Sequence, residues 1–140
     1  MAESSSPTAT GSCLCGGIRY QVRGELGAMV ACHCSRCRKA NGSAFQAAVP
    51  VATDGFELLA GAELLAGYES SPGVHRMFCR RCASPLYSRR DAMPALLRLR
   101  VGTLDTPLPA GPAMHVFVGS KADWYEIHDG AEQYPTRPGE

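Results

Sequence analysis

The sequence predicts an all-β protein, and three observations lead to that expectation. Short runs of residues alternate apolar and polar side chains, which is the period of a strand with one face in water. The 15 glycines and 10 prolines separate many of these runs with turns. Helical periodicity is nearly absent, and seven cysteines fall into three tight clusters. We therefore expect one zinc-clipped domain of short antiparallel strands.

The first expected strands lead the chain into a cysteine cluster. Residues 18–22 alternate apolar with polar side chains, and a glycine-flanked turn follows them. Residues 28–32 form a second short strand that ends at the cysteine triplet. Ser35 is expected to cap a single helical turn that runs through Lys39 and stops at Asn41 and the glycine after it.

The middle of the chain predicts a buried strand and a hairpin. Residues 45–51 are mostly apolar, with an irregularity at Pro50, and an Asp-Gly turn follows. Residues 56–59 and 64–68 lie on either side of Gly61. Two short apolar runs around a glycine are typical of a β-hairpin, so we expect these two to pair with each other.

The second half of the chain continues the strand pattern. Residues 74–78 run from a Pro-Gly turn into the last cysteine doublet, and residues 85–89 follow that doublet. Residues 97–101 alternate leucine or valine with arginine, which indicates a half-exposed strand. A loop rich in proline and glycine covers residues 102–112, and residues 114–118 form the final strand.

The cysteines are spaced as metal ligands are spaced. Cysteines two or three residues apart cannot readily bridge one another, whereas their sulfurs can converge on one ion. Zn²⁺ takes four thiolates in a structural site, and a catalytic site keeps three protein ligands and one open position. The clusters are Cys13 and Cys15; Cys32, Cys34 and Cys37; and Cys79 and Cys82.

Seven thiols divide naturally into four and three, which predicts two zinc ions per chain. The triplet can wrap one ion locally, whereas each doublet supplies half a coordination shell and needs a complement elsewhere. A closed site built from the first doublet and two of the middle three cysteines is the alternative. We predict a closed structural zinc site from Cys13, Cys15, Cys79 and Cys82, and an open zinc site from Cys32, Cys34 and Cys37.

Length and charge narrow the class of protein. The 140 residues suit one domain, expected at residues 11–138 after a disordered leader at residues 1–10. A formal net charge of +1 provides no global field for nucleic acid or an anionic membrane, so we expect neither partner. No apolar run is long enough to cross a membrane, and no secretory signal is visible. With clustered thiols, these features favour a reducing cytoplasm. Oligomeric state is left open.

Three residues beside the cysteine triplet and one histidine in the expected final strand are candidates for further roles. Arg38 and Lys39 follow the third ligand of the open site, where they could bind the anionic end of a substrate. The alternative is that these cations simply offset the negative charge of the thiolates. His33 is expected to be a local hydrogen-bonding group, and His115 a core histidine with its hydrogen bonds satisfied or a group behind the metal. No catalytic residue is assigned.

Three cysteine motifs together resemble one known family. They are Gly11-Ser-Cys-Leu-Cys-Gly-Gly17, Cys32-His-Cys-Ser-Arg-Cys-Arg38 with Gly42-Ser43, and Phe78-Cys-Arg-Arg-Cys-Ala-Ser-Pro85. The chain is similar to the glutathione-dependent formaldehyde-activating enzyme and centromere protein V family. The resemblance extends to a C-terminal segment containing His115-Val-Phe-Val118, Ser120-Lys121, Trp124 and Asp129-Gly130.

The resemblance implies a β-tent fold, the four-plus-three zinc grouping, and glutathione or a similar thiol as cosubstrate. It implies carbon-sulfur lyase chemistry on a thiol adduct, with S-hydroxymethylglutathione as the family's product. A non-catalytic zinc-stabilised binding or scaffold module is the second hypothesis, and methionine sulfoxide reduction ranks last because no separate redox cysteine remains. The chain departs from the family at Ala83, where glycine is usual; a positive φ there would cost about 1 kcal/mol.

Overall fold

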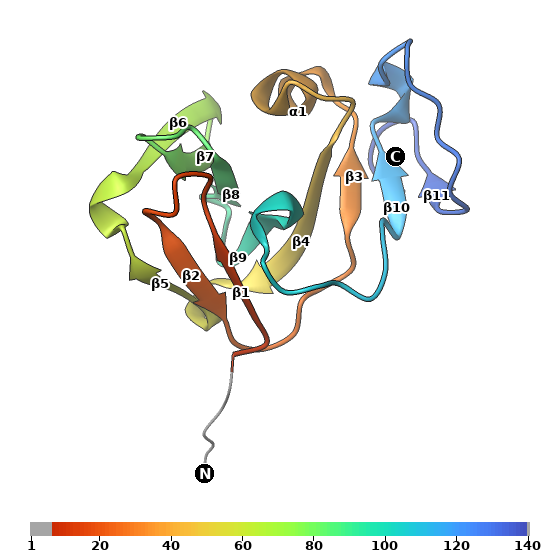
Figure 1. Ribbon diagram of the computed structural model, residues 1–140. Helices are drawn as coiled ribbons and strands as arrows, with labels where there is room; N and C mark the ends of the chain where they lie inside the picture. Colours follow the sequence, from red (N-terminus) through yellow and green to blue (C-terminus); the bar gives the residue numbers. More distant parts are fainter. Residues whose placement is uncertain (1–6, 140) are drawn as a thin grey trace. The chain divides into compact units, whose positions relative to one another are not determined.

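A computed structural model describes residues 7–139 and confirms the all-β class. These residues contain eleven strands and one α-helix, α1 (Figure 1). Of the predicted leader, residues 1–6 lie outside the described residues, and Ala9 and Thr10 already belong to strand β1. The domain boundaries 11–138 stay a prediction. The strands are β1 (Ala9–Ser12), β2 (Arg19–Val22), β3 (Val30–Cys32), β4 (Gln46–Ala52), β5 (Phe56–Ala60), β6 (Leu65–Ser71), β7 (Val74–Cys79), β8 (Pro85–Arg90), β9 (Met93–Arg100), β10 (Met114–Val116) and β11 (Glu132–Gln133).

The described chain forms two compact units. Unit 1 contains residues up to 27 and residues 49–107, and unit 2 contains residues 28–48 and 108 onward. Strand β4 begins in unit 2 and ends in unit 1. None of the described helices is long and apolar enough to cross a membrane.

Unit 1 holds a three-stranded antiparallel sheet in the order β1, β2, β5. Ile18, Tyr20 and Val22 are fully buried, which confirms the alternation expected at the start of the chain. The Tyr20 hydroxyl and Thr103 Oγ1 are hydrogen-bonded to each other at 2.7 Å, so the polar end of Tyr20 is satisfied inside the core.

The second part of unit 1 is an antiparallel meander of β6, β7, β8 and β9 (Figure 1). Leu97 and Leu99 point into the core as expected. Arg100, expected on the half-exposed face, is instead 6% exposed. Its guanidinium donates to Ser88 Oγ and to the Arg98 carbonyl, and these bonds compensate for its burial.

The predicted hairpin around Gly61 is wrong. Strand β5 pairs with β2 and β6 pairs with β7, so the two flanking runs belong to different sheets. Gly61 has φ 86°, and a 3₁₀ turn at Ala62–Leu64 follows it. A Cβ at Gly61 would lie 2.2 Å from the Gly17 carbonyl oxygen, so the glycine here permits a close backbone approach.

Unit 2 is built around strand β10, which pairs in parallel with both β3 and β11. Strand β3 also pairs with β4, antiparallel. The predicted final strand is shorter than expected because Phe117 adopts a left-handed φ of 57° directly after Val116. The two-residue strand β11 has no sequence pattern of its own and was not predicted.

Helix α1 (Ser35–Asn41) lies in unit 2 and starts one residue earlier than expected. Cys34 is its N-cap residue, in place of the predicted Ser35, and its sulfur accepts a bond from the Cys37 N–H at 3.4 Å. The helix ends where predicted, because Gly42 takes the left-handed conformation at φ 63° and bonds the Arg38 carbonyl.

Candidate metal centres

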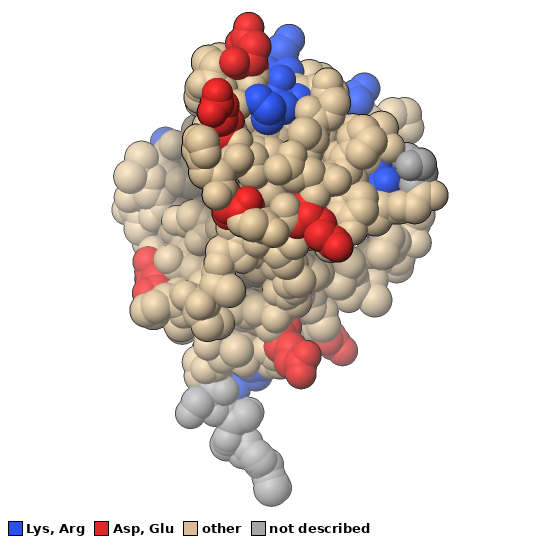
Figure 2. All heavy atoms as spheres, turned by 90° about the vertical axis from the view of Figure 1, so that its right-hand side faces the viewer, with Lys and Arg blue, Asp and Glu red and all other residues tan. Residues whose placement is uncertain are grey.

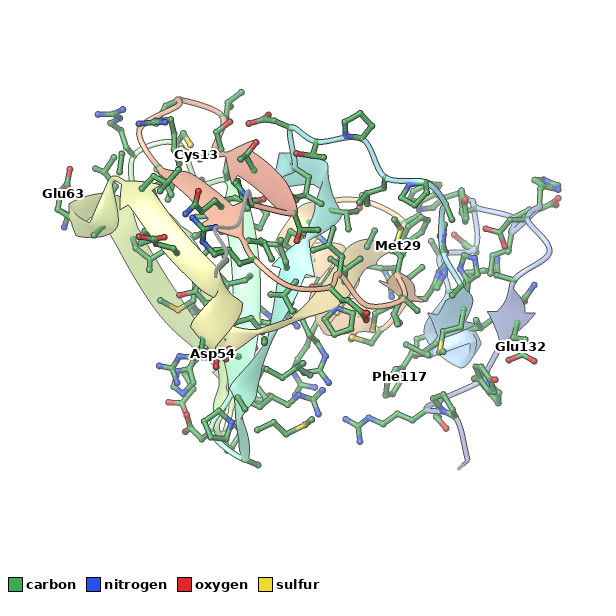
Figure 3. All side chains as sticks on the ribbon, turned by 90° about the horizontal axis from the view of Figure 1, so that it is seen from below. Cys13, Met29, Asp54, Glu63, Phe117 and Glu132 are labelled. Carbon is green, nitrogen blue, oxygen red and sulfur yellow. The ribbon has the colours of Figure 1, made fainter. Side chains whose placement is uncertain are left out.

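Four thiols of unit 1 converge in one cluster, which we call the four-thiol cluster: Cys13, Cys15, Cys79 and Cys82. Two of them lie in the turn after β1, where Figure 3 labels Cys13, and the other two at the end of β7 and in the turn that follows. Their ligand atoms all lie within 4.8 Å of one another. Sulfur-to-sulfur distances of 3.6 Å from Cys13 to Cys15 and 3.9 Å from Cys15 to Cys79 exclude disulfide bonds there.

These spacings fit a tetrahedral zinc ion. A Zn–S bond of about 2.3 Å places neighbouring sulfurs of a tetrahedron about 3.8 Å apart. The 3.6 and 3.9 Å separations lie close to that value. The donor set therefore fits a structural Zn(Cys)₄ site.

Several N–H groups point at the sulfurs of the four-thiol cluster. The backbone N–H of Ile18 donates to Cys13 at 3.3 Å, and that of Gly17 donates to Cys15 at 3.4 Å. Arg81 Nε donates to Cys15 at 3.2 Å. The Gly17 N–H and then the Arg81 guanidinium lower the pKa of Cys15. Donors placed in this way stabilise thiolates, which are the form that binds metal.

The other two thiols of this cluster differ in their surroundings. A hydrogen bond with Ser84, whose Oγ lies 3.4 Å from the Cys82 sulfur, lowers the pKa of Cys82 to about 5. Burial raises the pKa of Cys79. The same Ser84 oxygen accepts the backbone N–H of Leu14 at 2.8 Å, so one hydroxyl joins the two cysteine turns.

The remaining thiols form a second cluster in unit 2, the three-thiol cluster: Cys32, Cys34 and Cys37. Cys32 ends β3, Cys34 caps α1, and Cys37 lies buried within α1. Their sulfurs also lie within 4.8 Å of one another. The thiols are thus grouped as four and three, without the mixed grouping that the sequence left open. A hydrogen bond with Cys37 and then burial raise the pKa of Cys32.

The two predicted anion-binding residues both lie on α1. Arg38 is half-buried, and its Nε donates to the Ser120 carbonyl at 3.2 Å, which holds the segment after β10 against the helix. Lys39 is exposed. Arg81 Nε, which donates to Cys15, is placed to offset the charge of a thiolate there. The substrate-binding role of Arg38 and Lys39 stays a prediction.

A hydrogen-bonded chain of Asp129, His115 and His33 in unit 2, which we call the relay, was not predicted from the sequence. His33 Nε2 lies 2.8 Å from His115 Nδ1, and His115 Nε2 lies 3.0 and 3.1 Å from the two carboxylate oxygens of Asp129. Both histidines are fully buried. His115 is the satisfied core histidine that was expected, whereas the partner of His33 is 82 residues away and not local. Buried histidines need hydrogen-bond partners, but no rule of sequence spacing pairs either histidine with Asp129.

A third group of ionisable residues lies on the surface of unit 1. His75 Nε2 is 3.0 Å from the Asp91 carboxylate, which also pairs with Arg89 at 3.3 Å. Glu69 accepts the Gly73 N–H at 2.8 Å. Because both carboxylates are exposed and already bonded within the protein, we interpret this group as a surface network at the β6–β7 and β8–β9 turns.

Comparison with known proteins identifies the family. The family model described as glutathione-dependent formaldehyde-activating enzyme matches residues 8–120. The chain belongs to this family. The match includes all seven cysteines and His115, and it ends before Asp129.

Relatives of the family are distant in sequence. One protein from Aspergillus flavus and one from Aspergillus oryzae are each 23% identical over 116 residues, which is 81% of this chain and 54% of the relative. Their names assign them provisionally to the glutathione-dependent formaldehyde-activating enzymes. The chain thus spans about half the length of these curated relatives. A crystal structure of a Rhodobacter sphaeroides protein is similar with a TM-score of 0.60 and 26% identity, covering 71% of this chain and 91% of that one.

Proposed function

We propose that this protein is a zinc-dependent carbon-sulfur lyase that acts on a glutathione-type thiol adduct. The reaction is formation of S-hydroxymethylglutathione from glutathione and formaldehyde, or a related reaction. The three-thiol cluster carries the proposal, because it offers three ligands to an ion that takes four. The family, which is named for glutathione and formaldehyde, supports this choice of substrates. A reducing cytoplasm suits a protein with seven free thiols.

The chemistry joins one sulfur to one carbon. Cys32, Cys34 and Cys37 would hold a Zn²⁺ ion, which would stabilise the thiolate form of a substrate thiol at neutral pH. In the adding direction, the substrate sulfur bonds to the formaldehyde carbon, the carbon-oxygen π bond breaks, and the hydroxyl oxygen gains a proton. In the reverse direction, the carbon-sulfur bond breaks and the thiol regains its proton. Cys32, Cys34 and Cys37 fix where that sulfur lies.

The cations on α1 are proposed to orient the substrate. Glutathione carries carboxylates, and Arg38 and Lys39 directly follow the last thiol of the three-thiol cluster. Figure 2 shows acidic and basic side chains interspersed among uncharged ones on the face that it presents. We therefore assign recognition of the carboxylates to local contacts, without steering by a field of one sign.

The decisive experiment follows the metal while thiol is added. Protein loaded with two Co²⁺ ions per chain is titrated with glutathione, and the thiolate-to-cobalt absorption is recorded. Entry of the substrate sulfur should raise that absorption to saturation. S-methylglutathione, which has no free thiol, should leave it unchanged. An unchanged spectrum with glutathione, both ions still bound, would remove the lyase proposal and leave a zinc-stabilised binding module.

Cys34→Ser supplies a matched control for this titration. Serine is a good N-cap residue, so α1 keeps its cap while the three-thiol cluster loses a thiolate. The variant should fold, keep the cobalt of the four-thiol cluster and lose the response to glutathione. A full response in this variant would place the thiol at the other cluster.

The orientation role of Lys39 has its own test. Lys39→Ala removes an exposed contact worth about 1 kcal/mol, so glutathione affinity should fall about fivefold with two zinc ions retained. Arg80→Ala removes an exposed positive charge from unit 1 and should not change the affinity. Equal affinity in wild type and Lys39→Ala, measured by calorimetry, would return Lys39 to a role in charge balance.

A further inference from the structure

The relay of Asp129, His115 and His33 links three separate stretches of unit 2. His33 directly follows β3, His115 lies in the middle of β10, and Asp129 lies in the loop between Phe117 and Glu132, two residues that Figure 3 labels. Asp129 also accepts the Ala131 N–H at 3.1 Å, which orients its carboxylate. Its side chain is 42% exposed, so the relay runs from the surface to a fully buried ring.

Proton positions in the relay follow from its geometry. The hydrogen bond from His115 lowers the pKa of Asp129, so the carboxylate is ionised and accepts. With both rings uncharged, His115 Nε2–H donates to Asp129 and His115 Nδ1 is the acceptor for His33 Nε2–H. His33 Nδ1 is then unprotonated. Within the described residues that atom is buried without a hydrogen-bond partner, which is costly in a core that satisfies the other atoms of the relay.

The ring of His33 packs against aromatic side chains as well as bonding His115. Phe45 packs against it with ring centroids 5.1 Å apart, and Tyr125 lies at 6.4 Å. The His33 backbone N–H donates to the Val116 carbonyl at 2.9 Å, which extends the pairing of β3 with β10 by one residue. Ring and backbone of His33 are therefore both attached to β10.

Position 33 lies between two thiols of the three-thiol cluster. Cys32 ends a strand, and Cys34 has extended backbone angles of φ −66° and ψ 157°. Successive side chains of an extended chain point to opposite sides, so Cys32 and Cys34 share one side and His33 takes the other. An anchor at His33 thus fixes the direction in which both thiols point.

We propose that the relay of Asp129, His115 and His33 positions the three-thiol cluster: it anchors the chain between Cys32 and Cys34 so that their sulfurs converge with that of Cys37. This role rests on the proposed metal site of the three-thiol cluster. None of the three relay residues needs to touch the metal or the substrate. They are positioning residues, and their effect should appear first in metal affinity.

Two substitutions at position 33 separate anchoring from other roles. In His33→Gln, the side-chain amide nitrogen reaches the place of imidazole Nε2 and can still donate to His115. In His33→Asn, the shorter amide reaches only the place of Nδ1 and loses His115. Both replace the ring by an amide, so they differ in reach and not in chemistry.

The test is Co²⁺ binding to each cluster, measured by absorption in competition with a chelator. His33→Asn should weaken Co²⁺ at the three-thiol cluster by roughly 10- to 100-fold, as loss of outer contacts does at other metal sites. The four-thiol cluster in unit 1 should keep its affinity, which reports that unit 1 folds in the variant, and the recovery in His33→Gln reports on unit 2. His33→Gln should recover most of the loss. Equal affinities in the two variants, or better binding by His33→Asn, would overturn the proposal.

Asp129→Asn tests the relay from its exposed end and leaves the core intact. An amide at position 129 can donate to His115, which would reverse the proton order and place the His33 proton on Nδ1. Ring ¹⁵N chemical shifts should report that reversal, together with weaker Co²⁺ at the three-thiol cluster. His128→Gln, at a neighbouring histidine whose side chain is 81% exposed, should change neither. Unaltered shifts and affinity in Asp129→Asn would contradict a role for the carboxylate.

The metal assay and the glutathione titration can fail separately. If His33→Asn loses Co²⁺ selectively but wild-type protein ignores glutathione, the relay stands and the lyase proposal falls. If wild type responds to glutathione and His33→Asn keeps its Co²⁺, the lyase proposal stands and the relay proposal falls. A wild-type protein that binds no Co²⁺ at the three-thiol cluster would contradict both.

Discussion

Two non-glycine residues of the described chain hold left-handed backbone angles. Ala83 has φ 68° and follows the last thiol of the four-thiol cluster, and Phe117 has φ 57° and directly follows β10. Left-handed conformations bring Cβ close to the following carbonyl oxygen and cost about 1–2 kcal/mol. At Ala83 the backbone N–H bonds the Cys79 carbonyl at 2.7 Å, so the turn around the thiols imposes the strain. The structure therefore has the positive φ at Ala83 that the sequence analysis considered.

Replacing Ala83 with glycine should therefore stabilise the protein. The relief of left-handed strain exceeds the added entropy of the unfolded chain, for a net gain of about 0.5–1 kcal/mol in the free energy of unfolding. Urea unfolding of zinc-loaded protein measures the change. Ala52→Gly is the control, because Ala52 is exposed at φ −67° and glycine there should destabilise. A loss of stability in Ala83→Gly would show that the turn carries no strain.

Tyr20 should make the protein sensitive to alkali. Burial raises the pKa of Tyr20 to about 12 from a usual 10.0. The folded state thus keeps a proton that the unfolded state loses, and stability that is complete below pH 10 declines as the pH rises toward 12. The decline attributable to Tyr20 is about 2–3 kcal/mol.

Tyr20→Phe should remove this part of the alkaline decline. It should also cost about 1 kcal/mol at neutral pH through the lost bond to Thr103. Unfolding free energies at several pH values between 8 and 12 measure both effects. Tyr68→Phe, at a side chain 66% exposed, should retain the wild-type pH dependence. Identical alkaline slopes in wild type and Tyr20→Phe would rule the explanation out.

At the scale of elements, the sequence predicted most strands but not their pairing. Alternation located β2 and the end of β9, because apolar residues at every second position need one buried face. Pairing depends on contacts between distant segments, such as the approach of Gly61 to Gly17, which no local pattern records. The same holds for the site: spacing indicated both thiol clusters, whereas the Asp129 relay depends on the parallel pairing of β3 with β10.

The turn at Gly61 offers a direct test of that close approach. Gly61→Ala combines a φ of 86° with a Cβ only 2.2 Å from the Gly17 carbonyl oxygen. Gly24→Ala has a similar φ of 90° and nothing within 4 Å, so it should cost about 1 kcal/mol from conformation alone. Gly61→Ala should cost about 1–3 kcal/mol more because of the overlap. Urea unfolding compares the two, and equal losses would mean that the backbone yields easily.

At the scale of the whole molecule, each unit carries one thiol cluster of its own. We expect zinc-saturated protein to hold two ions per chain by metal analysis. The three-thiol cluster should release its ion first during titration with a chelator, because it has one fewer protein ligand. Unit 1 should stay folded through that first release, as far-UV circular dichroism would show. A saturated preparation that holds one ion would refute the division into four and three.

The two segments of unit 2 are far apart in the sequence, and this separation affects how the unit forms during synthesis. The thiols of its cluster lie in residues 28–48, whereas β10 and the relay partners lie beyond residue 108. A ribosome that adds about 5–20 residues per second needs about 4–16 s for the roughly 80 residues between them. Throughout that interval the nascent chain has no His115 against which to anchor His33. The three thiols are therefore made early and anchored late, so we expect this cluster to reach its full metal affinity only after β10 has emerged.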